Sequence, residues 1–243
     1  MKKLFFLLRN NAVLFSGFLA IIFLFSACKK TVDTVHQPVA GLMAFNLIPD
    51  KASIGVAISN QSLTNSPLLY TSYTGGYLGV YGGNRDVTTY DFNSRTTLAT
   101  TSQLFADSTN YSVFAVGANG SYRNLVVKDN LDSLSSSTGE AFVRYVNAIA
   151  DSTKQPLVTI SSNGTDVFNN NAPFATVSDF KGITPGDVSV KVINESAINS
   201  SRTITLEQGK IYTILLVGLP DQADSSKAVQ IKFIQNGTIS TTP

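Results

Sequence analysis

One internal repeat restricts the fold of this chain more than any other feature of its sequence. The first copy opens with AFNLIPD from Ala44, and the second opens with YVNAIAD from Tyr145. The matching residues all lie 101 positions apart: Asn46 and Asn147, Asp50 and Asp151, Phe105 and Leu206, and Tyr111–Gly117 and Tyr212–Gly218. Because the offset is the same at both ends of the unit, the sequence predicts two tandem domains of one fold.

Each copy has the residue pattern of β-strands. The valines of Val188–Val192 alternate with Ser189 and Lys191, as expected of a strand with one buried face. Tyr212–Leu219 is apolar throughout, which is typical of a central strand buried on both faces. Val229–Phe233 alternates again and is expected to end at Asn236-Gly237. We therefore predict an all-β fold with two tandem immunoglobulin-like β-sandwich domains after a cleaved N-terminal signal segment.

The expected domain boundaries follow from composition. We assign residues 1–27 to a lipoprotein signal peptide, 28–40 to a lipidated tether, 41–130 to the first sandwich, 131–140 to a linker and 141–243 to the second sandwich. Ser135–Gly139 is rich in serine, and such stretches are usually flexible and solvated. The two domains are accordingly expected to behave as beads on a short string.

The N-terminus has the layout of a secretory signal. Lys2 and Lys3 precede an apolar segment from Ala12 to Phe25 that only Ser16 and Gly17 interrupt. This segment has about fourteen residues, whereas a helix needs roughly twenty to span a bilayer. A permanent transmembrane anchor is therefore the weaker interpretation.

The segment ends in Leu24-Phe25-Ser26-Ala27-Cys28, which resembles the lipobox of bacterial lipoproteins. The resemblance implies cleavage before Cys28 and acylation of its thiol and new amino group, with palmitate as a typical acyl chain. Two or three acyl chains hold a protein stably on a membrane. Phe25 is bulkier than the usual residue there. Lys29 follows where an aspartate would be a retention signal, so the chain is similar to outer-membrane lipoproteins. The alternative is an incidental cysteine in an ordinary signal peptide.

Composition excludes several classes of function. Without residues 1–27 the basic count falls from 18 to 15 against 16 acids, and the net charge changes from +2 to −1. No nucleic-acid partner is expected, because phosphate binding needs clustered Lys and Arg. The single cysteine and the single histidine, His36 in the tether, make thiol chemistry, catalytic triads and His-ligated metals improbable. We expect no enzyme activity, metal or cofactor.

Several motifs of the second copy resemble one known family. They are RYVNAIAD from Arg144, Val177–Phe180, Pro185-Gly186 with the following valine strand, and Gly209–Thr213. They are similar to the domain-of-unknown-function family 4397 of exported bacterial proteins, best over residues 141–219. The first copy resembles the same family but is more divergent, with Gly82-Gly83 about where Pro185-Gly186 lies. The resemblance implies a fold and export but no mechanism.

Asp50 and Asp151 recur after the first strand of each copy, and a repeated acid suggests a calcium ligand. Calcium needs six to eight oxygen ligands, which close carboxylates often supply. Each of these aspartates stands without acidic neighbours in the sequence, so an aspartate that caps a turn is the favoured interpretation.

A tyrosine-rich stretch is the candidate ligand surface. Residues 69–83 contain Tyr70, Tyr73, Tyr77 and Tyr81. In a strand, Tyr77, Gly79 and Tyr81 share one face and would form a flat shelf that could stack a sugar or a protein side chain. The alternative is that these tyrosines are ordinary strand residues of the core.

Three functions remain open from the sequence. The leading hypothesis is a non-catalytic, lipid-anchored protein of the cell envelope whose two sandwiches bind a glycan or an envelope protein. The second is a purely structural spacer or cell-wall scaffold. The third is a hydrolase with two carboxylates about 5 to 9.5 Å apart.

Overall fold

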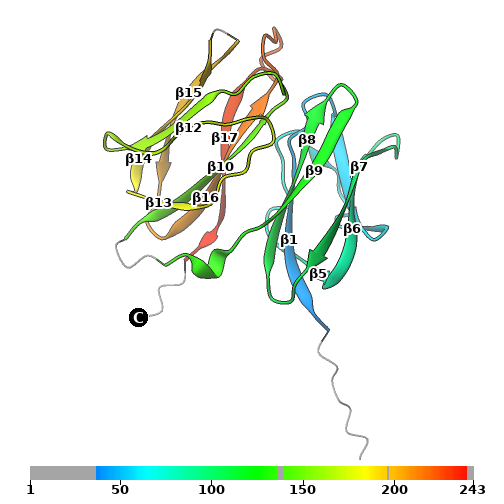
Figure 1. Ribbon diagram of the computed structural model, residues 1–243. Coiled ribbons are helices and arrows are strands. Elements are labelled where there is room, and N and C mark those ends of the chain that lie inside the picture. Colours follow the sequence, from blue (N-terminus) through cyan, green and yellow to red (C-terminus); the bar gives the residue numbers. More distant parts are fainter. Residues whose placement is uncertain (1–36, 136–138, 196, 240–243) are drawn as a thin grey trace, which may run out of the picture. The chain divides into compact units, whose positions relative to one another are not determined.

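Strands account for almost all regular structure in the computed structural model, which describes residues 37–135, 139–195 and 197–239 (Figure 1). They form two β-sandwich domains, each of two sheets. The predicted all-β fold with two tandem immunoglobulin-like sandwiches is thereby confirmed. The predicted signal peptide, Cys28 and most of the tether lie outside the described residues. No helix among the described residues is long and apolar enough to cross a membrane.

Domain 1 contains nine strands. One sheet has the order β5-β1-β8-β9, and the other has the order β3-β2-β6-β7, with β4 paired to β2. The bounds are β1 Val39–Asn46, β2 Ser53–Ile58, β3 Gln61–Ser62, β4 Leu68–Leu69, β5 Leu78–Tyr81, β6 Gly83–Asp91, β7 Thr97–Phe105, β8 Asn110–Ala118 and β9 Ser121–Lys128.

The described residues of domain 2 form eight strands in the same arrangement. Its sheets have the orders β13-β10-β16-β17 and β12-β11-β14-β15. The bounds are β10 Ala141–Ile149, β11 Leu157–Ser162, β12 Thr165–Asn171, β13 Lys181–Ile183, β14 Gly186–Asn194, β15 Ile198–Leu206, β16 Lys210–Gly218 and β17 Gln230–Thr238. In the described part of the segment between the domains, Leu131–Ser133 forms a 3₁₀ turn.

The core of each sandwich lies between its two sheets. In domain 2 the alternating Val188, Val190 and Val192 of β14 point into this core, as the sequence pattern predicted. Tyr212, Ile214 and Leu216 of β16 face them from the other sheet. Residues of β1, β2 and β8 form the corresponding core of domain 1.

The repeat seen in the sequence is also a repeat of hydrogen bonds. The first strand of each domain pairs in parallel with a strand near its end, β1 with β8 and β10 with β16. The phenol oxygens of Tyr111 and Tyr212 each accept a bond of 3.1 Å from a backbone N–H five residues upstream. These bonds fix the chain where it enters the central strand of each domain.

Asn46 and Asn147 likewise have one role in both copies. Each amide group donates to a backbone carbonyl, of Leu68 at 2.9 Å and of Ala172 at 2.8 Å. Each side-chain oxygen accepts from the backbone N–H two residues on, at 3.1 Å in both domains. Because both asparagines are buried, these bonds satisfy polar groups that would otherwise be costly.

The expectation of beads on a string is wrong, because the two domains share a buried apolar layer. We call this layer the interdomain cluster; domain 1 supplies Met43, Phe45, Leu47, Phe114 and Val116, and domain 2 supplies Val146, Ala148, Leu215, Val217 and Ile234. These side chains lie on the outer faces of the sheets that contain β1 and β10. The apolar run of β16 is therefore buried on both faces, by its own core on one side and by domain 1 on the other.

Two local expectations also need correction. The segment after β9 is not solvated throughout, since Asp129 is buried and Leu131 and Leu134 pack against Phe142, Ile211 and Ile239 of domain 2. Residues 136–138 of the serine-rich stretch lie outside the described residues. Asn236-Gly237 does not end the last strand but lies within β17, which continues to Thr238.

Candidate functional site

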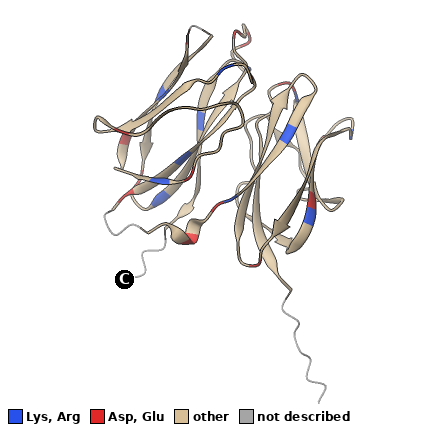
Figure 2. Ribbon diagram, in the orientation of Figure 1, with Lys and Arg blue, Asp and Glu red and all other residues tan. Residues whose placement is uncertain are grey.

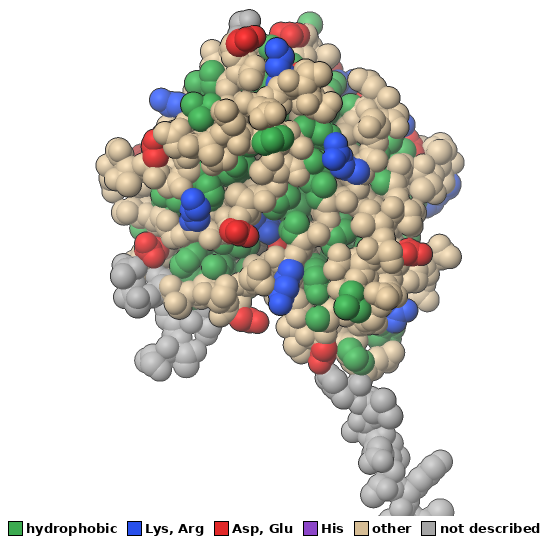
Figure 3. All heavy atoms as spheres, in the orientation of Figure 1, with side chains coloured by type: hydrophobic (Ala, Val, Ile, Leu, Met, Phe, Trp, Pro, Cys, Tyr) green, Lys and Arg blue, Asp and Glu red, His purple; other side chains and the backbone are tan. Residues whose placement is uncertain are grey.

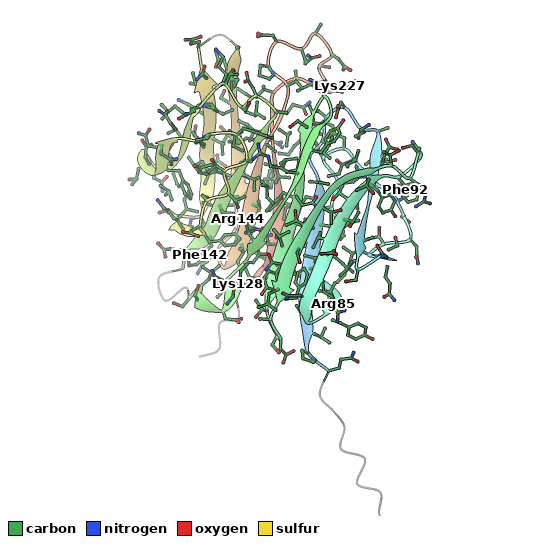
Figure 4. All side chains as sticks on the ribbon, turned by 45° about the vertical axis from the view of Figure 1, so that its right-hand side comes forward. Arg85, Phe92, Lys128, Phe142, Arg144 and Lys227 are labelled. Atoms are coloured by element: carbon green, nitrogen blue, oxygen red, sulfur yellow. The ribbon has the colours of Figure 1, made fainter. Side chains whose placement is uncertain are left out.

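A buried ion pair lies at the edge of the interdomain cluster. Arg144 of β10 donates from Nη1 to Oδ1 of Asp129, which follows β9, at 2.6 Å. The two residues are only 2% and 1% exposed. The guanidinium also lies 4.4 Å from the ring centre of Phe180 and 5.3 Å from that of Phe114. The pair thus joins one domain to the other inside an apolar layer, and Figure 4 shows the position of Arg144.

Hydroxyl groups satisfy the rest of this ion pair. Asp129 Oδ2 accepts from Tyr77 Oη at 2.6 Å and from Ser112 Oγ at 2.7 Å. Arg144 donates to Ser112 Oγ and to Thr213 Oγ1, both at 2.9 Å. Burial, and next the charge of Asp129, raise the pKa of Tyr77 well above its usual value. Since three donors already bind the carboxylate, it is suited to holding the domains together rather than to abstracting a proton.

The interface is built with approximate two-fold symmetry. Arg144 and Thr213 stand 101 positions after Met43 and Ser112, which occupy the same places in domain 1. Asp129 and Asn236 also correspond, because Asp129 accepts from Ser112 Oγ at 2.7 Å and Asn236 accepts from Thr213 Oγ1 at 2.6 Å. Asn236 Nδ2 contacts Met43 Sδ at 3.9 Å. The Asp129–Arg144 contact and the Asn236–Met43 contact are therefore counterparts, as in an isologous dimer interface.

A hollow of about 310 Å³ opens beside the ion pair. Its lining includes Asp129, Arg144 and Leu134, together with Val177–Phe180. Four charged residues line it: Asp129 and Arg144, which are bonded to each other across the interface, and Lys128 and Asp179. Because residues of both domains line it around the ion pair, we assign this hollow to the junction of the domains.

The structure separates the four tyrosines of the predicted ligand surface. Tyr70, Tyr73 and Tyr77 are partly buried against the interdomain cluster, and Tyr73 stacks on Phe45 with ring centres 5.5 Å apart. The hydroxyl of Tyr70 is buried without a hydrogen-bond partner, and burial raises its pKa. Tyr81 lies at the open end of the same sheet face, 55% exposed and paired with Val39. The interpretation as core residues therefore fits three of them, and only Tyr81 lies on open surface.

The two repeated aspartates have different kinds of partner. Asp50 Oδ2 accepts from the backbone N–H of Asn119 at 2.7 Å and from Tyr122 Oη at 2.8 Å. Asp151 Oδ1 accepts from the hydroxyl and the backbone N–H of Thr153, and these bonds lower the pKa of Asp151. Within the described ranges, no group of three or more His, Cys, Asp or Glu side chains could hold a metal ion. Capping of its own turn fits Asp151, whereas Asp50 bonds the turn between β8 and β9, so the expectation of a local cap is wrong for Asp50.

The sequence interpretation missed the ion pair, although β10 carried a signal for it. In AFVRYVNAI, Arg144 is the one charged residue of a mostly apolar strand, and all nine residues of the strand are buried. A cation in such a position needs a buried partner. Elsewhere Lys and Arg are dispersed over both domains, as Figure 2 shows.

Comparisons with solved structures find β proteins of low similarity. The tip fimbrial protein Mfa3 of Porphyromonas gingivalis is 8% identical, with a TM-score of 0.26 and coverage of 82% of this chain and 100% of that one. Putative cell adhesion proteins of Parabacteroides distasonis and Bacteroides eggerthii are also 8% identical, with TM-scores of 0.22 and 0.24. For both, the match covers 83% of this chain, and it covers 100% and 96% of theirs respectively. No curated protein matches this sequence.

A family model matches the chain twice, over residues 40–154 and 141–239. The two matches correspond to the two β-sandwich domains and together cover most of the chain. This confirms the two-copy resemblance predicted from the sequence motifs. The chain therefore belongs to the DUF4397 family, a domain of unknown function, and carries two copies of its domain.

Proposed function

We propose that the protein is a non-catalytic lipoprotein of the cell envelope, anchored in the outer membrane by lipid on Cys28, that displays its paired domains as one rigid binding module. The lipobox before Cys28 supports the anchor. The tether then leads to Val39, the first residue of β1. The ligand is a glycan or an envelope protein.

The observation that carries the proposal is the buried junction of the two domains. The Asp129–Arg144 pair and the interdomain cluster hold the sheets face to face, so the free faces keep a fixed relation to one another. A fixed pair of domains loses little conformational entropy on binding, which favours recognition. On the face that Figure 3 shows, apolar and charged side chains are scattered among uncharged polar groups, a mixture that suits contact with polar ligands.

Replacement of Cys28 with serine tests the anchor. The wild-type chain is expected to incorporate radiolabelled palmitate in its native host and to sediment with outer membranes. The Cys28→Ser chain should incorporate none and should leave the outer-membrane fraction, because the thiol is the acceptor of the diacylglyceryl group and the acyl chains supply the membrane affinity.

A Ser26→Ala chain serves as the matched control, since it keeps a small residue before the cysteine and should label like the wild type. Label that persists in the Cys28→Ser chain, or a wild type that takes up none, would refute the anchor. Binding by the wild type is then screened with glycan arrays and with solubilised envelope proteins.

A further inference from the structure

The open end of domain 1 contains a hollow with the character of a small-molecule site. Its volume is about 540 Å³, and it lies between the two sheets where β5 leads into β6. Four apolar side chains line it, those of Ile58, Leu63, Leu78 and Val80, together with Tyr81 and Arg85 and several small or polar residues. Predominantly apolar walls with a few polar groups are typical of ligand pockets of this volume.

Arg85 is the charged group of this hollow. Its Nε donates to the carbonyl of Tyr81 at 3.3 Å, and its Nη2 donates to the carbonyl of Gly82 at 3.1 Å. These two neutral carbonyls orient the guanidinium but do not neutralise it. The residues that line the hollow include no carboxylate. Figure 4 shows Arg85 at the end of domain 1 where β1 begins, away from Phe92 at the other end of β6.

The position equivalent to Arg85 in domain 2 is part of a filled core. β6 and β14 both begin with a glycine of positive φ, Gly83 and Gly186, which pair with Phe105 and Leu206. This register makes Arg85 equivalent to Val188. Val188 is fully buried in the core of domain 2. An inward position that is valine in one copy is therefore a cation in the other.

A second core position differs in the same way. Ile58 and Ile160 are equivalent, because they pair with Val87 and Val190 at the same distance along β6 and β14. The other neighbour of Ile160 is Phe168, which is buried and packs edge-on against Tyr145. The other neighbour of Ile58 is Gln61, an exposed residue that lines the hollow. Domain 2 thus fills with valine and phenylalanine the volume that domain 1 leaves open with arginine and glutamine.

We propose that this hollow binds a small carboxylate with an apolar tail. The carboxylate would take a bidentate bond from the Arg85 guanidinium, a geometry that the planar fork of arginine favours. The tail would lie on Ile58, Leu63 and Val80. A cation in place of an apolar core residue lowers the stability of the fold. Residues that break the usual core pattern in this way concentrate at functional sites. This site is independent of the anchor and of the interface in the proposed function.

The probe for this site is octanoate labelled with fluorine at its last carbon, titrated into the full chain held in nanodiscs and followed by ¹⁹F NMR. We expect saturable binding to the wild type and affinity at least about tenfold lower for Arg85→Val, because a hydrogen bond to a charged group is lost. Lys191→Val is the matched control, since Lys191 is an exposed residue of strand β14 outside this hollow and its loss removes the same charge. Because all the nanodiscs have the same lipid composition, partition of octanoate into the lipid contributes equally to every titration.

The melting temperature separates a binding role from a structural one. Arg85→Val should melt at the wild-type temperature or above it, since valine is the residue that domain 2 buries at this position. If Arg85→Val fails to fold, Arg85→Gln replaces it in the same titration with the same expected loss. Any one of three results would overturn the proposal. The substituted chain binds octanoate as tightly as the wild type, the wild type binds octanol as tightly as octanoate, or the wild type shows no saturable binding. None of these results bears on the labelling of Cys28.

Discussion

Replacing Arg144 with methionine is expected to lower the free energy of unfolding by about 3–5 kcal/mol. The substitution leaves the Asp129 carboxylate buried at 1% exposure without its cation, although Tyr77 and Ser112 still donate to it. Methionine is the residue at the equivalent position of domain 1, Met43, so its size suits a sheet face of this kind. The loss is measured by denaturant unfolding of the full chain.

The double variant Asp129→Asn with Arg144→Met is expected to recover most of that loss. It places an asparagine and a methionine where the counterpart contact has Asn236 and Met43. Replacing a buried ion pair by residues of similar volume is often neutral or stabilising, whereas removing one partner is not. A double-mutant cycle gives the coupling energy directly. Additive losses from the two substitutions would show that the residues do not act as a pair.

Replacing Gly218 with alanine is expected to be the most disruptive small substitution in domain 2. Gly218 has a φ of +111°, and a Cβ there would lie 2.2 Å from the carbonyl oxygen of Ala228. Because that neighbour is backbone, it cannot move aside cheaply. The backbone conformation costs about 1–3 kcal/mol for a residue with a side chain, and overpacking adds about 1–3 kcal/mol.

Gly186→Ala is the control that separates the two costs. Gly186 has the same φ of +111°, but apart from its chain neighbours no atom lies within 4 Å of the place that a Cβ would take. We expect Gly186→Ala to lower stability by the conformational cost alone, and Gly218→Ala to lower it further by several degrees in melting temperature. Equal melting temperatures for the two variants would show that the backbone at Ala228 yields to the added atom.

The sequence predicted the repeat and the strands well because both leave local signals. The alternation of Val188–Val192 gives the strand and its buried face directly, and Asn46 and Asn147 mark the same turn in each copy. The boundary at Asn236-Gly237 was wrong because these residues usually mark turns. Here Asn236 is instead held in β17 by its bond to Thr213.

The pairing of the domains could not be derived from the sequence alone, although part of its signal was present. In a sandwich open to solvent, an outer face should be polar, yet Phe45, Phe114 and Leu215 are apolar at outward positions. Such residues indicate a covered face but do not identify what covers it. The partner of Arg144 could not be predicted, because Asp129 belongs to the other domain and lies beside a stretch that was assigned to a linker from its composition.

The tyrosine-rich stretch and the hollow beside Arg85 likewise depend on tertiary structure that the sequence pattern does not give. Alternation correctly placed Tyr77 and Tyr81 on one face, but only the position of domain 2 decides that Tyr77 is covered and Tyr81 is not. Arg85 became informative only when strand register made it equivalent to Val188. Neither result follows from composition or periodicity.

The rigid pairing of the two domains is tested most directly by a distance measurement between them. Nitroxide labels on Leu104→Cys and Ile193→Cys, both exposed positions, report it by electron–electron double resonance in the Cys28→Ser chain. We predict one narrow distance distribution for this chain, a broad one after Arg144→Met, and a narrow one again in the double variant with Asp129→Asn. A broad distribution in the chain with Arg144 and Asp129 intact would contradict the claim that the two domains form one rigid body.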